Sequence, residues 1–160
     1  MPFVVAIVAA VLGVGGFRLS SPAFHAGGRI PVRYTCDGAD VSPLLRWAAP
    51  PRGTRSLALV VTDVSTPSRY THWLAWAISP RARGLASGAH PRREGTNDFG
   101  RRGYGGPCPP AGPAHRYVFR LYALRAALTV PAGADAVTVR RALSRQRPLA
   151  VATLVGTYGR

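Results

Sequence analysis

Four polar side chains stand where apolar segments of the sequence meet loops, and their types can do chemistry. Asp63 closes one apolar run and His72 opens the next. His115 and Tyr117 open a third. Strand ends beside loops can converge on one patch, and such patches often form binding pockets. Any one of these residues is well explained as a strand-end group bonded to backbone, but the set of four is harder to explain that way.

These residue types are compatible with three chemistries, and their spacing does not select one. Two histidines and one aspartate could form a facial metal triad. Ser65 with a histidine and an aspartate could supply a nucleophile, although the chain has no Gly-x-Ser-x-Gly elbow. Imidazole and phenol groups, together with loop N–H groups, could instead bind an oxyanion.

A long loop leads into the third segment. Residues 95–110 contain five glycines and three prolines, which exclude a regular helix or a central strand. Long loops inside compact domains are usually functional or disordered. Phe99 and Tyr104 favour order, because disordered tracts are poor in aromatic residues. The loop runs into His115 and the alternating segment 116–124, so we expect a pocket where loop and sheet meet.

The hydrophobic pattern predicts a mainly β domain. The predicted strands are 17–19, 30–34, 57–63, 72–78, 116–124 and 149–158. Pro31 suggests an edge strand or a strand start, and residues 57–63 read as a central buried strand. The one convincing helix is 137–144, with Asp135 placed to cap its N-terminus and Arg140 expected on the surface.

Composition and charge limit the class of protein. The 160 residues fit a single domain, expected to span 17–160 without repeat or linker. The formal net charge is +15 and every cation is arginine. A GC-rich genome produces such usage, while a functional interpretation is affinity for phosphate or anionic lipid. The arginines are scattered, and neither zinc-finger spacing nor an aromatic RNA-binding signature is present, so we expect no nucleic-acid binding.

Residues 1–16 form an apolar leader with the length of a signal-peptide core rather than of a full membrane span. It is either signal-like or an anchor, and a buried first strand or helix stays open as the alternative. Cys36 and Cys108 both lie in loops. They are either free buried thiols or, in an exported chain, a disulfide. Export or membrane association is therefore favoured over a cytoplasmic location.

Several segments, in order, resemble the phosphatidylethanolamine-binding protein family in its bacterial Raf-kinase-inhibitor-like branch. They are Thr35–Trp47, the turn at Asp63, His72–Trp73, and Asn97–Pro110 followed by His115–Tyr117. The resemblance extends from roughly Phe17 to the C-terminus. It implies a mainly β fold with a large central antiparallel sheet, a smaller second sheet and few short helices.

The resemblance also implies a small pocket for phosphate-like anions or phospholipid head groups. The residues that fall on this pocket and its rim are Asp63, Tyr70, His72, Gly106, Pro107, Pro109, His115 and Tyr117. We expect non-catalytic binding without cofactor or metal, with a protein partner, a peripheral membrane contact and a homodimer as further expectations. The alternative is a hydrolase or metal-dependent enzyme that uses Asp63, His72 and His115.

In this interpretation the histidines, the Tyr117 hydroxyl and the glycine-rich loop donate hydrogen bonds to a phosphate. Asp63 either orients a histidine or binds the ammonium of ethanolamine. The resemblance places the Cys36 and Cys108 loops beside the pocket and so predicts that the two residues lie within disulfide distance. One departure is Ser65, where the family usually has a second aspartate, which should make the rim less acidic.

Overall fold

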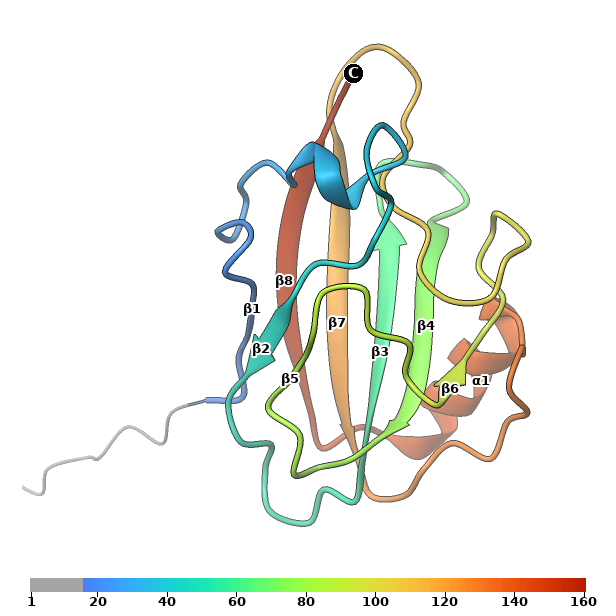
Figure 1. Ribbon diagram of the computed structural model, residues 1–160. Coiled ribbons are helices and arrows are strands. Elements are labelled where there is room, and N and C mark those ends of the chain that lie inside the picture. The colour runs from blue at the N-terminus through green and yellow to red at the C-terminus, as the bar shows by residue number, and fades with distance from the viewer. Residues whose placement is uncertain (1–15) are drawn as a thin grey trace, which may run out of the picture.

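The computed structural model describes residues 16–160 and contains two antiparallel sheets and one α-helix (Figure 1). The larger sheet has the strand order β6-β4-β3-β7-β8 and the smaller one the order β1-β2-β5. This confirms the predicted mainly β fold. The leader predicted for residues 1–16 lies, except for Gly16, outside the described residues. Among residues 16–160, no helix combines the length and apolar character needed to cross a membrane.

The elements alternate with loops, the longest of which joins β6 to β7. Their bounds are β1 Leu19–Ser20, η1 Val32–Tyr34, β2 Leu45–Trp47, β3 Ser56–Asp63, β4 Tyr70–Ile78, β5 Gly84–Leu85, β6 Arg93–Glu94, β7 His115–Leu124, α1 Ala136–Gln146 and β8 Ala150–Tyr158. The four longest predicted strands and the predicted helix are therefore confirmed, with small shifts at their ends.

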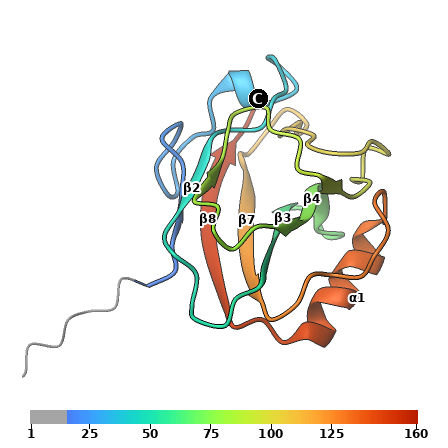
Figure 2. The same ribbon diagram turned by 60° about the horizontal axis from the view of Figure 1, so that its bottom comes forward.

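The small sheet and α1 lie on opposite sides of the large sheet (Figure 2). The core has two layers, one on each face of the large sheet. β3 is buried along its whole length and lies between β4 and β7. Its side chains alternate, because successive strand residues point to opposite faces. Leu57 and Leu59 pack toward the small sheet, whereas Ala58 and Val60 pack toward α1. Each face therefore has its own apolar layer, and each can carry its own site.

Helix α1 forms where the sequence predicts it. The Asp135 side chain accepts a hydrogen bond of 2.8 Å from the backbone N–H of Thr138, which confirms the predicted N-cap. Ala136, Val139 and Leu143 are buried at helical spacing. This apolar stripe holds α1 against the large sheet.

The strand predicted at 30–34 is wrong. Residues Val32–Tyr34 instead form the 3₁₀-helix η1, in which the N–H of Tyr34 bonds to the carbonyl of Pro31. Pro31 has its fixed φ of −60° and no N–H to donate to a sheet. Val32 is 46% exposed, so the apolar alternation that suggested a strand does not face a core.

A β-bulge in β4 positions one of the predicted site residues. Val61 of β3 pairs with Trp73, but the next residue, Thr62, pairs with Thr71. His72 is thus the extra residue between two ladder positions. Bulges re-aim side chains and are frequent beside functional sites. This bulge places Thr71 and Trp73 on opposite faces of the sheet, which regular alternation would not allow.

Candidate functional site

A small cavity of about 190 Å³ lies where β3, β4 and β7 meet the glycine-rich loop. It is lined by Asp63, Thr66, Tyr70, His72, Phe99, Cys108, Pro109, Pro110, His115 and Tyr117. Six of the eight predicted site residues are in this set. The other two, Gly106 and Pro107, are outside the lining. The strand pairing explains the convergence, because Asp63 is the register partner of both Tyr70 and Tyr117.

Asp63 orients His115. The Nδ1 atom of His115 lies 2.6 Å from Oδ2 of Asp63. An ionised carboxylate only accepts, so Nδ1 carries the hydrogen and Nε2 is the ring nitrogen left for a ligand. The second carboxylate oxygen accepts a 2.8 Å bond from the backbone N–H of Ser65. Both oxygens of Asp63 are thus engaged, as expected for an orienting residue rather than for an ammonium ligand.

His72 is held by the glycine-rich loop. Its Nδ1 atom lies 2.7 Å from the carbonyl oxygen of Gly105 and must be the donor, because a carbonyl only accepts. Burial lowers the pKa of His72, against the opposing effects of the Gly105 carbonyl and the Asp63 charge. The neutral ring therefore presents a lone pair at Nε2. His72 donates to an anion only after it takes up a proton, which corrects the expectation of a ready N–H donor.

Tyr117 lines the cavity and has a buried hydroxyl. Its side chain is only 1% exposed, and the hydroxyl has no hydrogen-bond partner among the described residues. Burial, followed by the nearby charge of Asp63, raises the pKa of Tyr117, so the group stays an O–H donor. Buried hydroxyls are normally paired. This one is a buried donor without a partner among the described residues.

Aromatic rings form the wall of the cavity. Tyr70 and Phe99 meet edge to face with their centroids 5.0 Å apart, and His72 lies 5.2 Å from the rings of both Phe99 and Tyr117. The Tyr70 hydroxyl donates to the carbonyl of Asp98 at 2.7 Å and is not free for a ligand. Phe99 was not among the predicted site residues, although an aromatic residue inside a glycine-rich loop is a usable signal.

The glycines of the loop serve close packing. The N–H of Gly105 bonds to the His72 carbonyl at 2.9 Å, and that of Gly106 to Oδ1 of Asp40 at 2.7 Å. These two N–H groups are bonded within the protein and are not free to donate to a ligand, contrary to the expectation for this loop. A Cβ atom on Gly106 would collide with the backbone of Tyr34, so glycine is needed for close approach.

The predicted disulfide between Cys36 and Cys108 is present, with a Cα–Cα distance of 5.4 Å. Cys108 also lines the cavity. Next to it, the N–H of Cys36 donates to the carbonyl of Pro107 at 3.1 Å. The disulfide and this hydrogen bond tie the rim of the cavity to the loop that follows η1.

Neither a three-residue metal cluster nor a serine bonded to a histidine occurs among the described residues. Within residues 16–160, no group of three or more His, Cys, Asp or Glu side chains is arranged to hold a metal ion. The Oγ atom of Ser65 accepts a 2.9 Å bond from the backbone N–H of Arg116 and does not line the cavity. No histidine is hydrogen-bonded to this hydroxyl to activate it.

Two solved bacterial proteins are similar to this chain in fold and sequence. A Chlamydia trachomatis homologue of phosphatidylethanolamine-binding protein, CT736, is 36% identical, with a TM-score of 0.84 over 91% of this chain and 98% of that chain. Escherichia coli YbcL, described as a member of the mammalian PEBP family, is 29% identical, with a TM-score of 0.83 over 90% and 98% of the two chains.

The chain is also similar in sequence to several proteins of known name. A UPF0098 protein of Methanothermobacter thermautotrophicus is 44% identical over 89% of this chain and 99% of its own length. A Mycobacterium tuberculosis protein named "Putative lipoprotein LppC" is 42% identical over 88% of this chain and 71% of its own length. The family model described as phosphatidylethanolamine-binding protein matches residues 20–159. The chain therefore belongs to the phosphatidylethanolamine-binding protein family.

Proposed function

We propose that this protein binds small phosphate-bearing molecules, above all phospholipid head groups, in the cavity beside Tyr117 and does not transform them. The observation that carries this proposal is that Tyr117 lines the cavity and has a buried hydroxyl without a hydrogen-bond partner among residues 16–160. A phosphate oxygen would accept from this O–H, and a hydrogen bond to a charged acceptor is worth about 1.5–3 kcal/mol.

The two histidines complete the donor set. Nε2 of His115 is left available by the bond between Nδ1 and Asp63, and Nε2 of His72 becomes a donor once the ring is protonated. A bound dianion would favour that protonation. The cavity of about 190 Å³ is small beside the roughly 300–1,000 Å³ of drug-sized ligand sites. It suits a head group rather than acyl chains.

An exported location fits this function. Disulfides persist in oxidising compartments and are rare in the cytosol of most organisms, and this chain has the Cys36–Cys108 disulfide. The relative from Mycobacterium tuberculosis carries a lipoprotein name. These two observations support our proposal that the protein acts in the cell envelope or outside the cell, where phospholipid head groups are accessible to it.

Calorimetric titration of the full chain with phosphorylethanolamine, inorganic phosphate and ethanolamine tests the proposal. Phosphorylethanolamine and phosphate should bind, and ethanolamine should not. The same samples followed by ³¹P NMR should show no release of phosphate. Binding of ethanolamine alone would indicate that Asp63 holds an ammonium group, and release of phosphate would favour the hydrolase alternative.

A further inference from the structure

A second cavity lies between α1 and the large sheet, on the face opposite the head-group cavity. Its volume is about 460 Å³. Its lining residues are Val60, Thr62, Arg69, Arg120, Tyr122, Arg140, Leu143, Ser144 and Pro148. It shares no residue with the cavity around Tyr117. Strand alternation explains this separation, because Arg120 and Tyr122 of β7 point away from the face that carries Tyr117.

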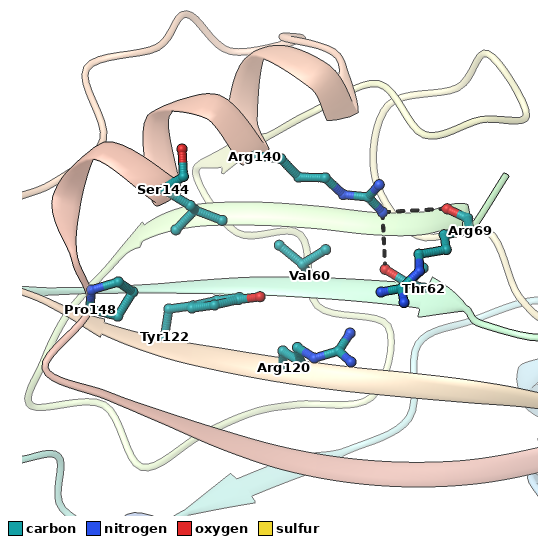
Figure 3. A pocket seen from close by; sticks show the side chains of 9 residues that line it. Val60, Thr62, Arg69, Arg120, Tyr122, Arg140, Ser144 and Pro148 are labelled. Atoms are coloured by element: carbon teal, nitrogen blue, oxygen red, sulfur yellow. Dashed lines mark hydrogen bonds between the residues drawn. The ribbon is translucent and has the colours of Figure 1, made fainter.

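Three arginines from three different elements gather at one end of this cavity (Figure 3). Arg69 belongs to the turn before β4, Arg120 to β7 and Arg140 to α1. Within the described residues, the side chains of Arg69 and Arg120 donate no hydrogen bond to another protein group. Their guanidinium groups are therefore free to bind a ligand.

From the sequence we expect Arg140 on the helix surface. In the structure its side chain is instead held by hydrogen bonds to other parts of the protein. Its Nη2 atom lies 2.8 Å from Oγ1 of Thr71 and 3.2 Å from Oγ1 of Thr62. The carbonyl of Arg69 is 3.4 Å away. All three acceptors are neutral, so the charge of Arg140 is oriented but not compensated.

No protein carboxylate neutralises this cluster. The chain has six acidic residues, all of them in the described part: Asp37, Asp40, Asp63, Glu94, Asp98 and Asp135. The ion pairs among residues 16–160 join four of these acids, Glu94, Asp40, Asp63 and Asp37, to His90, Arg101, His115 and Arg160 respectively. The side chain of Asp98 accepts from the backbone of Thr71, and Asp135 caps α1. The three arginines thus create an uncompensated positive field.

The opposite end of the cavity is apolar. In Figure 3, Pro148 and the base of the Tyr122 ring lie at this end, the Tyr122 hydroxyl points toward the arginines, and Val60 lies between the two ends. Leu143 of α1 completes this part of the lining. A ligand that satisfies both ends needs a compact negative charge and an apolar body. Arginine presents a fork that matches phosphate oxygens in a bidentate manner.

We propose that this cavity binds a phosphate monoester with an apolar body, with the phosphate on Arg69, Arg120 and Arg140 and the body on Tyr122 and Pro148. The site is independent of the head-group cavity. It differs in its size and charge, because its volume is about 460 Å³ against about 190 Å³ and three arginines line it, whereas no arginine lines the head-group cavity.

The test is a titration of the full chain with phenyl phosphate, followed residue by residue through backbone amide chemical shifts. We expect saturable shifts in α1 and β7 around Arg140 and Arg120. Arg120→Gln and Arg69→Gln should each weaken this binding by about tenfold or more, because a charge-assisted contact is lost. Arg145→Gln is the matched control, since Arg145 is an exposed residue of α1 outside this cavity.

Three comparisons can overturn the proposal. An equal loss of affinity for phenyl phosphate in Arg120→Gln and Arg145→Gln would show that binding depends on general positive charge and not on this cavity. Equal affinity for inorganic phosphate and phenyl phosphate would remove the role of the apolar body. Shifts confined to the surroundings of His115 would mean that only the head-group cavity binds phosphate. His115→Ala should leave the α1 shifts unchanged, and a failure of the head-group proposal would not alter this result.

Discussion

Thr62 and Asp63 are consecutive residues of β3 whose side chains line two different cavities on opposite faces of one sheet. Asp63 orients His115 on one face, and Thr62 accepts a hydrogen bond from Arg140 on the other. Because a strand turns each successive side chain to the other face, a single strand end serves both sites. A shift of one residue in the register of β3 would exchange the two residues and disable both sites.

His72 should make phosphate binding depend on pH. Burial holds the pKa of His72 below 6.5 in the free protein, and a bound phosphate favours the imidazolium, so this pKa rises on binding. His72 then takes up a proton when phosphate binds. The affinity for phosphate therefore increases as the pH falls from the pKa of His72 in the complex to its lower pKa in the free protein. Calorimetry with phosphorylethanolamine between about pH 8 and pH 5 measures this increase.

His72→Asn is the matched control for this pH dependence. The asparagine amide can still donate to the carbonyl of Gly105, but it cannot take up a proton. Titration of the ligand phosphate near about pH 6 affects both proteins equally. Only wild type should show the additional gain in affinity at low pH. Parallel curves for the two proteins would mean that His72 stays neutral when the ligand binds.

Gly106→Ala should destabilise the protein by about 2 kcal/mol or more, because the new methyl group meets backbone that cannot move aside. Its Cβ would lie 2.6 Å from Oδ1 of Asp40 and 2.9 Å from Cα of Thr35. Gly16→Ala is the control, since no atom of the described residues, apart from its chain neighbours, lies within 4 Å of its added Cβ. Urea unfolding compares the two variants. Similar midpoints would show that the loop packs more loosely than the structure indicates.

Removal of the disulfide by combining Cys36→Ser and Cys108→Ser should lower the free energy of unfolding by about 4 kcal/mol in the chain-entropy model. The bond links residues 72 positions apart. Binding of phosphorylethanolamine should also weaken, because Cys108 lines the cavity. Wild type kept in reductant should match the double variant. Two titratable thiols in unfolded, non-reduced protein would contradict the prediction.

The large sheet could be predicted from the sequence because its strands have strong patterns. The apolar run at 57–63 corresponds to β3, and the segments predicted at 116–124 and 149–158 correspond to β7 and β8. The strands β1, β2, β5 and β6 have two or three residues each, which is too short for a period to be recognised. The small sheet therefore came only from the family resemblance.

The residues of the site could be predicted from the sequence, but their arrangement in space could not. Asp63, His72, His115 and Tyr117 were found because they stand at strand ends, but their geometry depends on tertiary contacts. The bulge at His72 exists only in the pairing of β4 with β3, and no local pattern marks it. The anchoring of Arg140 on Thr62 and Thr71 likewise joins residues far apart in sequence.

The central claim is that the Tyr117 hydroxyl is a ligand donor, and Tyr117→Phe tests it directly. The substitution removes one oxygen that has no hydrogen-bond partner among the described residues, so the free energy of unfolding should not decrease. Affinity for phosphorylethanolamine should fall by about one to two decades, because a hydrogen bond to a charged oxygen is lost. Tyr34→Phe is the matched control, since Tyr34 does not line the cavity.

Calorimetric titration of Tyr117→Phe and Tyr34→Phe with phosphorylethanolamine, at one pH and ionic strength, is the decisive measurement. We expect Tyr117→Phe to bind phosphorylethanolamine more weakly than wild type, without a decrease in its free energy of unfolding. Tyr34→Phe should bind with the affinity of wild type. Equal affinity for Tyr117→Phe and wild type would contradict it, because the hydroxyl would then not contact the phosphate.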